Sequence, residues 1–285
     1  MKIGVSSYSL SRAIIAKQMT ILDAISWIVD NGGQHVEIVP IGFDLVDNPQ
    51  LIEAIRNKAS NLHVDISNYA IGSNFALQDE KAYEQEIARV MKQVDIANEL
   101  GVKLMRHDVA TSSDTSIHQF LVDLPRLALA CQRIADYASQ YGITTSVENH
   151  GYYIQASDRV QALIHAVNRP NFRTTLDIGN FMCVDEDSAA ATKNNIPHAS
   201  MVHLKDFYLR PSNQNPGPHW FQTTRGNYLR GAIFGHGDIN TREALRIIKQ
   251  SGYDGYLSIE FEGLEDCLLG TKLGMDNAVR IWNEI

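Results

Sequence analysis

Four short apolar runs in the second half of the chain end in ionisable side chains. They read SVENHG, TTLDIGN, VHLKDF and SIEFEG, and they supply Glu148, Asp177, His203 and Glu260. Each residue alone could instead cap a helix or form an ion pair, but the same phase in four runs favours a shared site. Three carboxylates and an imidazole at one place need a cation to neutralise them. We therefore predict that these four residues bind one divalent ion, Mn, Mg, Co, Fe or Zn, in a set too rich in oxygen for structural zinc.

Further polar residues fall in the same phase or directly after the same runs. Because side chains alternate along a strand, each run offers a deeper and a shallower group. The shallower groups are His150, Lys205 and Glu262. We expect His150 and Asn180 to contact a substrate rather than to bind the ion. His107, after the run KLMRHDV, is a further candidate for substrate contact.

The elements that must position these residues alternate between short runs rich in β-formers and longer helical stretches. The predicted strands cover residues 3–8, 35–40, 64–69, 102–107, 143–148, 173–177, 201–204 and 256–261. The predicted helices cover residues 20–31, 49–60, 79–100, 117–141, 157–167, 187–195, 241–251 and 275–284. Eight strand–helix units predict an α/β fold, a single (β/α)₈ TIM-barrel domain over residues 1–285, with its site at the carboxyl ends of the strands.

One connection is much longer than the others. We predict a loop over residues 208–235, after the seventh strand, and interpret it as a candidate lid. Its Arg210 and Arg225 could bind a phosphate or carboxylate of the substrate. Trp220 could exclude water or pack against another subunit.

Composition narrows the class of protein. The formal net charge is −8, which disfavours nucleic acid and anionic membranes as partners. Apolar runs stay short of the roughly 20 residues of a membrane helix, and GxGxxG and GxxxxGK[ST] motifs are absent from the sequence. The three cysteines are widely spaced and the first residues do not resemble a leader, so we expect a cytoplasmic protein.

The motifs VENHG, LDIGN, HLKD, GHGDIN and IEFEG occur in this order along the whole chain. They resemble the sugar phosphate isomerase/epimerase family of xylose isomerase-like TIM barrels, in the AP endonuclease 2 superfamily. The resemblance implies that Glu148, Asp177, His203 and Glu260 hold one metal ion. It also implies that Glu148 and Glu260 move a proton through an enediolate of the substrate, with Lys205 stabilising the oxyanion.

Two departures from related groups limit this resemblance. Endonuclease IV holds three zinc ions with extra histidines, whereas this chain has Asn68 and Asn180 near the corresponding positions. The ketose 3-epimerases also carry a histidine where Asn180 stands, while the pairing of His203 with Lys205 resembles inosose dehydratase.

From the resemblance as a whole we expect an isomerase or epimerase of a small sugar, sugar phosphate or keto-polyol. A lyase of the inosose or dehydroshikimate dehydratase type is the alternative, and homodimers or homotetramers are the expected assemblies. A non-catalytic sugar-binding barrel is disfavoured, because binding alone does not need two opposed glutamates.

Overall fold

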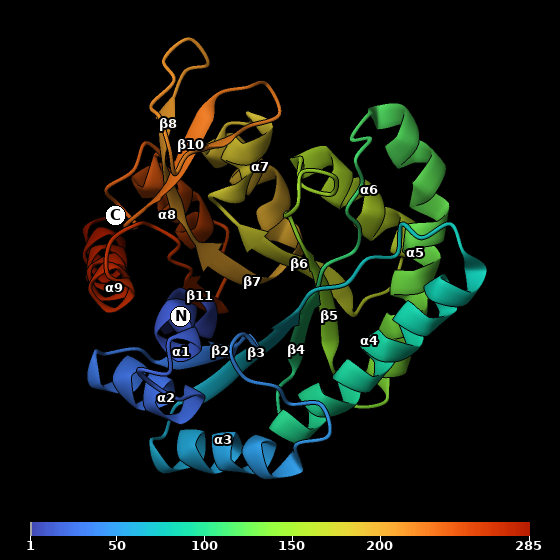
Figure 1. Ribbon diagram of the computed structural model, residues 1–285, viewed down its shortest axis with the longest axis horizontal. Coiled ribbons are helices and arrows are strands. Elements are labelled where there is room, and N and C mark those ends of the chain that lie inside the picture. The colour runs from blue at the N-terminus through green and yellow to red at the C-terminus, as the bar shows by residue number, and fades with distance from the viewer. Residues whose placement is uncertain (1) are drawn as a thin grey trace.

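Eight parallel strands close into a barrel in the computed structural model, which describes residues 2–285 (Figure 1). The strands follow one another around the barrel in the order β1, β2, β3, β4, β5, β6, β7 and β11, and β11 pairs with β1 to close it. Their bounds are Lys2–Ser6, His35–Ile38, Asp65–Ile71, Leu104–His107, Thr144–Glu148, Phe172–Asp177, Ala199–Leu204 and Tyr256–Ile259. The predicted (β/α)₈ fold is confirmed.

Helices form the outer ring of the barrel (Figure 1). The longer ones are α2 Ile21–Asp30, α3 Pro49–Asn61, α4 Glu80–Leu100, α5 Ile117–Ser139, α6 Ser157–Val167, α7 Ser188–Asn195, α8 Thr241–Gln250 and α9 Cys267–Glu284. Short helical segments are η1 Ser7–Leu10, α1 Ser11–Ile15, η2 Asn180–Val184 and η3 Ile196–His198. Thr20 and Asp23 form the capping box that begins α2, and Gly101 ends α4 at a φ of 80°.

Helix α9 begins at Cys267, well before the predicted start at residue 275. Asp266 caps it by accepting a hydrogen bond from the Leu269 N–H at 2.9 Å. Two glycines inside the helix hide this start in the sequence, because glycine is a poor helix former. Gly270 is needed there, since a Cβ at this position would lie 2.4 Å from the Phe261 ring.

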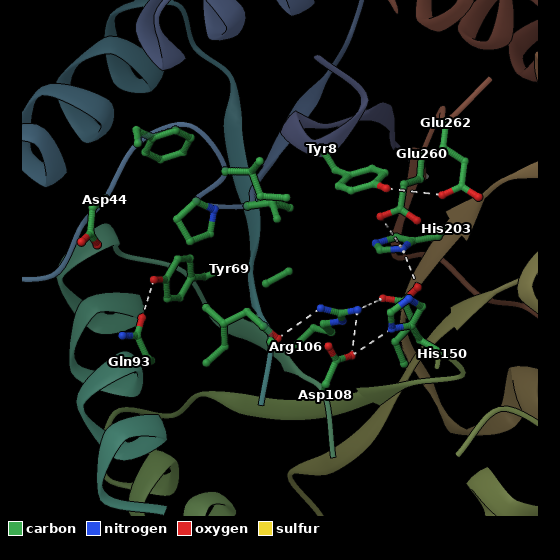
Figure 2. Close-up of a pocket in the computed structure, with 18 of the residues that line it drawn as sticks. Tyr8, Asp44, Tyr69, Gln93, Arg106, Asp108, His150, His203, Glu260 and Glu262 are labelled. Carbon is green, nitrogen blue, oxygen red and sulfur yellow. Dashed lines mark hydrogen bonds and ion pairs between the residues drawn. The ribbon is translucent and has the colours of Figure 1, made fainter. Parts of the chain in front are cut away.

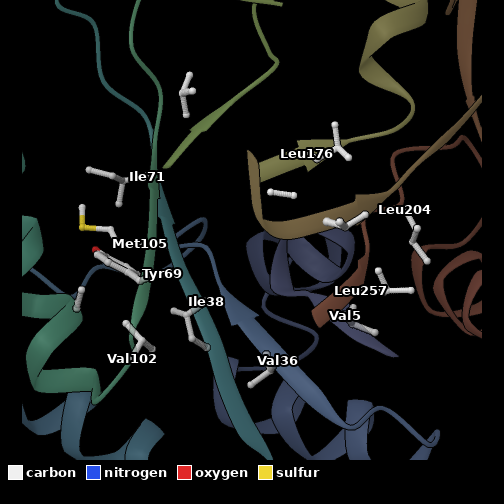
Figure 3. Close-up of a cluster of buried hydrophobic side chains, with 14 of the residues drawn as sticks. Val5, Val36, Ile38, Tyr69, Ile71, Val102, Met105, Leu176, Leu204 and Leu257 are labelled. Atoms are coloured by element: carbon white, nitrogen blue, oxygen red, sulfur yellow. The ribbon is translucent and has the colours of Figure 1, made fainter. Parts of the chain in front are cut away.

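Alternation along the strands separates the core from the site. Leu176, Leu204 and Leu257 are buried and belong to the main apolar cluster, which Figure 3 shows around the strands. Their neighbours Asp177 and His203 have the opposite phase and face the barrel interior. Register brings these inward residues level with one another, because Asp177 pairs with His203 across β6 and β7. The apolar packing outside the barrel therefore fixes the height of the polar residues inside it.

The segment predicted as a loop over residues 208–235 contains most of a second, antiparallel sheet. Strands β8 (Asp206–Arg210), β9 (Phe221–Gln222) and β10 (Tyr228–Ala232) lie in the order β8, β10, β9. The sheet projects beyond the barrel beside α7 and α8 (Figure 1). It has an apolar face of its own, because Phe207 and Leu229 are buried with Cys183 and Ile239 in a small separate cluster.

One carboxylate anchors this sheet to the barrel. Asp206 accepts backbone hydrogen bonds from Phe207, Gly235 and Gly237 at 2.9 Å and from Ile239 at 3.3 Å. These bonds join the start of β8 to the turn that precedes α8. Across residues 2–285, every helix is too short or too polar to span a lipid bilayer.

Candidate metal centre and active-site cavity

Four ligand-type side chains meet at the carboxyl ends of the strands. Glu148, Asp177, His203 and Glu260 each offer an atom within 4.8 Å of the others, and all four are buried. The Nδ1 atom of His203 lies 3.6 Å from Glu148 Oε1, 3.6 Å from Glu260 Oε1 and 4.0 Å from Asp177 Oδ2. The structure thus brings together the residues that the sequence analysis selected as ligands.

The hydrogen bonds around this cluster orient its free atoms. The Nε2 atom of His203 lies 3.0 Å from Glu37 Oε1, and within residues 2–285 its Nδ1 has no hydrogen-bond partner. Because Nε2 faces Glu37, Nδ1 is the ring nitrogen that faces the cluster. Asp177 Oδ1 is occupied by the N–H groups of Gly179 and Asn180 at 2.7 and 3.0 Å, which leaves Oδ2 toward the other ligands. This donor set fits a single divalent ion.

Electrostatics support the same interpretation. Burial raises the pKa of Asp177 to about 7, against the neighbouring Lys205 ammonium and with help from the Glu260 and Glu148 carboxylates. Burial opposes a charged His203, but the carboxylates of Glu37, Glu260 and Glu148 raise its pKa well above its usual value. The cluster therefore has excess negative charge that protons or a cation must neutralise.

Lys205 and Asn180 connect the ligands to one another. Lys205 Nζ lies 2.6 Å from Glu260 Oε2 and 3.3 Å from Asp177 Oδ2. Asn180 is buried, donates to Glu148 Oε1 at 3.0 Å and accepts from Lys205 at 3.2 Å. Both residues are thus placed to hold the two glutamates on opposite sides of the cluster.

Arg106 on β4 is a site residue that was not predicted from the sequence. Its Nη2 lies 2.6 Å from Glu148 Oε2 and 3.0 Å from Asp108 Oδ1. His150 Nδ1 lies 3.4 Å from the same Asp108 oxygen. Although burial favours a neutral carboxyl, the Arg106 guanidinium holds the pKa of Glu148 well below its usual range.

Glu37 on β2 was also missed, although the sequence carries a signal for it. It is a single carboxylate inside the otherwise apolar run HVEIV, and it is fully buried. Asn68 on β3 donates to its Oε1 at 2.7 Å. Charged residues are rarely fully buried without a partner, so a lone glutamate in a barrel strand predicts a paired site residue.

A cavity of about 650 Å³ opens at the cluster and extends toward the β2–α3 connection and α4. Figure 2 shows Glu260, His203 and His150 near one end, and Asp44, Tyr69 and Gln93 near the other. Tyr8, from η1, lies beside the ligands with its hydroxyl 3.5 Å from Glu262 Oε2. Burial raises the pKa of Tyr8 to about 12, so its phenol stays protonated at neutral pH.

His107, predicted to contact substrate, lies outside this cavity. Its ring is fully buried between Phe75 and Phe172, with ring centroids 5.8 and 6.2 Å away. Strand alternation explains the correction, because Arg106 faces the barrel interior and the next residue must face the helices. His150, in contrast, lines the cavity as expected.

Arg210, Trp220 and Arg225 also lie outside the cavity, on the small antiparallel sheet and its turns. Arg210 stacks on the Trp220 ring at 5.6 Å and pairs with Asp238 at 3.4 Å. The Arg225 N–H donates to Asp185 at 2.8 Å. Arg210 and Arg225 thus connect the small sheet to Asp238 and Asp185. A substrate role for Arg210, Trp220 and Arg225 stays a prediction.

The profile of the xylose isomerase-like TIM barrel family matches residues 25–282. The chain belongs to this family. Its cluster of Glu, Asp and His at the strand ends lies where the barrel places its site.

Relatives of the chain include epimerases and dehydratases. It is 24% identical over 189 residues to L-ribulose-5-phosphate 3-epimerase from Salmonella typhi, an alignment that covers 64% of this chain and 58% of the epimerase. It is 22% identical over 218 residues to inosose dehydratase from Lacticaseibacillus casei, covering 70% of this chain and 71% of the dehydratase.

Solved structures share the fold across nearly the whole chain. D-psicose 3-epimerase from Clostridium cellulolyticum superposes with a TM-score of 0.75 at 16% identity, covering 99% of both chains. The probable 3-DHS dehydratase from Bacillus anthracis also gives 0.75 at 16% identity, covering 98% and 99%. Both reaction classes therefore occur on this fold.

The buried position of His107 predicts a pH-dependent stability. Burial lowers the pKa of His107 to about 4, below the 6.5 of an exposed histidine. The unfolded chain then binds the proton more tightly, so stability is lost as the pH falls from 6.5 toward 4. We expect His107 to contribute roughly 3 kcal/mol to this loss. Because glutamine does not titrate, the His107→Gln variant lacks this loss. The difference in free energy of unfolding between the original protein and the variant should therefore narrow by this amount from pH 7 to pH 4. Urea unfolding measures this stability gap.

The matched control is His118→Gln, at an exposed position on α5. Its stability gap should stay constant over the same range. A constant gap for His107→Gln as well would show that His107 is not held neutral by burial.

Proposed function

We propose that the chain is a divalent-metal-dependent isomerase or epimerase that acts on a small sugar, sugar phosphate or related keto-polyol. The observation that carries this proposal is the buried cluster of Glu148, Asp177, His203 and Glu260 at the end of a cavity of about 650 Å³. Two glutamates from different strands face that cavity, which is the arrangement that proton transfer on either side of a bound substrate requires.

The four ligands would hold the ion, which supplies Lewis-acid polarisation of a substrate carbonyl when bound. The proton beside that carbonyl would pass to a carboxylate oxygen of Glu148 or Glu260, which leaves an enediolate. The opposite glutamate would return a proton to the other face. Arg106 and Asn180 orient Glu148 for this step, while Lys205 orients Glu260 through its ion pair of 2.6 Å.

Lys205 has a second task in this mechanism. Its ammonium is buried and, despite the opposing effect of burial, the carboxylates of Asp177, Glu260 and Glu262 hold its pKa well above the usual value. A permanently charged donor at this place would stabilise the negative charge that develops on the substrate oxygen. Tyr8 and His150 line the same cavity and complete the polar surroundings of the reacting carbons.

The proposed mechanism makes a prediction about the metal and the two glutamates. Removing metal with a chelator should abolish activity, and Mn²⁺ should restore it. Replacing Glu148 or Glu260 with Gln should each lower kcat by about 10²- to 10⁴-fold, because each variant lacks a proton-transfer group. Steady-state kinetics on the reactive ketose measures both effects, with circular dichroism to confirm folding. Full turnover by metal-free protein or by either variant would refute the mechanism.

A further prediction concerns Glu37, which contacts His203 rather than the ion. Glu37→Gln should weaken Mn²⁺ binding by about 10- to 100-fold, because the carboxylate fixes the orientation and raises the basicity of the imidazole. Calorimetric titration of chelator-treated protein measures this. Glu262→Gln removes a carboxylate from the same cavity but outside the ligand cluster, and it should leave the affinity for Mn²⁺ nearly unchanged. Equal affinities for all three proteins would contradict the role of Glu37.

A lyase of the inosose or dehydroshikimate dehydratase type remains the second candidate. His150, which is half exposed and beside Asp108, could give a proton to a departing hydroxyl. Incubation in D₂O separates the two reactions. We expect deuterium to be incorporated at the carbon beside the carbonyl without loss of water. Mass spectrometry and NMR detect this incorporation. Growth of enone absorbance with cyclitol ketones, without epimeric product, would instead assign the lyase.

A further inference from the structure

The cations around the cavity are all committed to carboxylates. Lys205 is bound to Glu260 and Asp177, as described above. Arg106 is shared between Glu148 at 2.6 Å and Asp108 at 3.0 Å, and it also donates to the Ile71 carbonyl at 3.1 Å. Both cations are therefore paired with carboxylates beside the ligand cluster, at the opposite end of the cavity from Asp44 and Gln93.

Arg89, on α4, is the cation at the far end of the cavity from the ligand cluster. Glu86 binds its fork with two hydrogen bonds of 2.8 Å, one to Nε and one to Nη2. The same Nη2 donates to the Gly72 carbonyl at 2.7 Å. The imidazole of His150 completes the set of basic side chains outside the cluster, and it faces Asp108. Within residues 2–285, each of these cavity-lining basic side chains thus has a carboxylate neighbour.

The far end instead offers uncharged and acidic hydrogen-bonding groups. Gln93 is buried on α4, and its Oε1 accepts a bond of 2.6 Å from the Tyr69 hydroxyl. That bond leaves the amide Nε2 on the side of Gln93 that faces away from Tyr69 (Figure 2). Asp44, on the β2–α3 connection, accepts the Val46 N–H at 2.9 Å with Oδ1 only. Figure 2 shows both side chains at this end.

Apolar side chains also line the cavity. They are Val39, Pro40, Ile41, Phe43, Val46 and Ile71. This apolar wall can pack against the carbon skeleton of a sugar. It offers no polar group to replace the water that a charged ligand group loses. A phosphate carries roughly 1.5 to 2 negative charges at neutral pH, and it is bound best by a cation that can give it several hydrogen bonds.

We infer that this cavity takes an uncharged polyhydroxy carbonyl compound, a free sugar or cyclitol ketone, and discriminates against its phosphate ester. The hydroxyl groups remote from the reacting carbons donate to Asp44 and accept from the Gln93 amide. A phosphate at that position faces the Asp44 carboxylate and an Arg89 already held by Glu86. The inference rests on the proposed function and narrows its substrate class.

The test compares matched pairs of free ketoses and their terminal phosphate esters, with L-ribulose and D-fructose as the parent sugars. Binding to the Mn²⁺-loaded protein is measured by calorimetry, and turnover is measured by deuterium incorporation from D₂O. We expect kcat/KM at least about tenfold higher for the free sugar of a pair, the equivalent of one unfavourable charge contact. Equal or better binding and turnover of the phosphate esters overturns the inference, as does failure of every free ketose and cyclitol ketone to bind.

Variants of Gln93 test whether the far end of the cavity determines the preference for the free sugar over its phosphate ester. Gln93→Leu should raise KM for the free sugar about fivefold, the effect of one hydrogen bond, with kcat and Mn²⁺ content nearly unchanged. Gln93→Arg should shift the kcat/KM ratio toward the phosphate ester by about tenfold or more. Gln85→Leu, on the same helix but facing an outer groove between α3 and α4, is the matched control and should change neither.

Different experimental outcomes would refute the proposed function and the proposed substrate class. Tight binding of free sugars without metal-dependent deuterium exchange refutes the proposed function and supports the substrate class. Exchange that prefers phosphate esters, or that does not respond to either Gln93 variant, refutes the substrate class and leaves the proposed function intact.

Discussion

The arrangement of this barrel depends on the burial of negative charge. Four carboxylates, those of Glu37, Glu148, Asp177 and Glu260, lie within the closed end of the site with few solvent contacts. Unpaired, such charges would be strongly destabilising. His203, Lys205 and Arg106 are each in contact with at least one of them. The proposed ion completes this balance, in which Lys205 and Arg106 are already paired with carboxylates.

The two halves of the barrel have different roles in this arrangement. Strands β5, β6, β7 and β11 supply the ligand cluster, and β2 and β4 supply Glu37 and Arg106 behind it. The β2–α3 connection and α4 form the remaining walls of the cavity. The proposed chemistry and the proposed substrate choice therefore lie on different segments of the barrel.

Strand alternation decided how much of the site could be predicted from the sequence. Glu148, Asp177, His203 and Glu260 were found because each follows an apolar run with a clear phase. The same rule, applied to KLMRHDV, should have selected Arg106 instead of His107, but a strand of four residues gives too little pattern to set the phase. Glu37 was not predicted as a site residue, because the prediction relied on strand ends in the second half of the chain.

Other elements depend on contacts that are distant in the sequence. Strands β8 and β10 were predicted as loop because their aromatic and basic residues lack a regular apolar pattern, and the sheet forms through pairing across the turn. The early start of α9 was hidden by Gly270, whose role is the close approach of Phe261. The barrel itself was predictable, since its eight strand–helix units each carry their own periodicity and helix-terminating signals.

The attachment of the small sheet through Asp206 has a consequence for protein engineering. Asp206 holds the base of β8, while the connection at the distal end over residues 211–220 is largely exposed. Grafted peptides, affinity tags or a fluorescent reporter can therefore be inserted at that distal end, because the graft would leave the anchoring bonds intact. Asp206 directly follows Lys205, so a reporter there would lie one short strand away from the reacting centre without altering it.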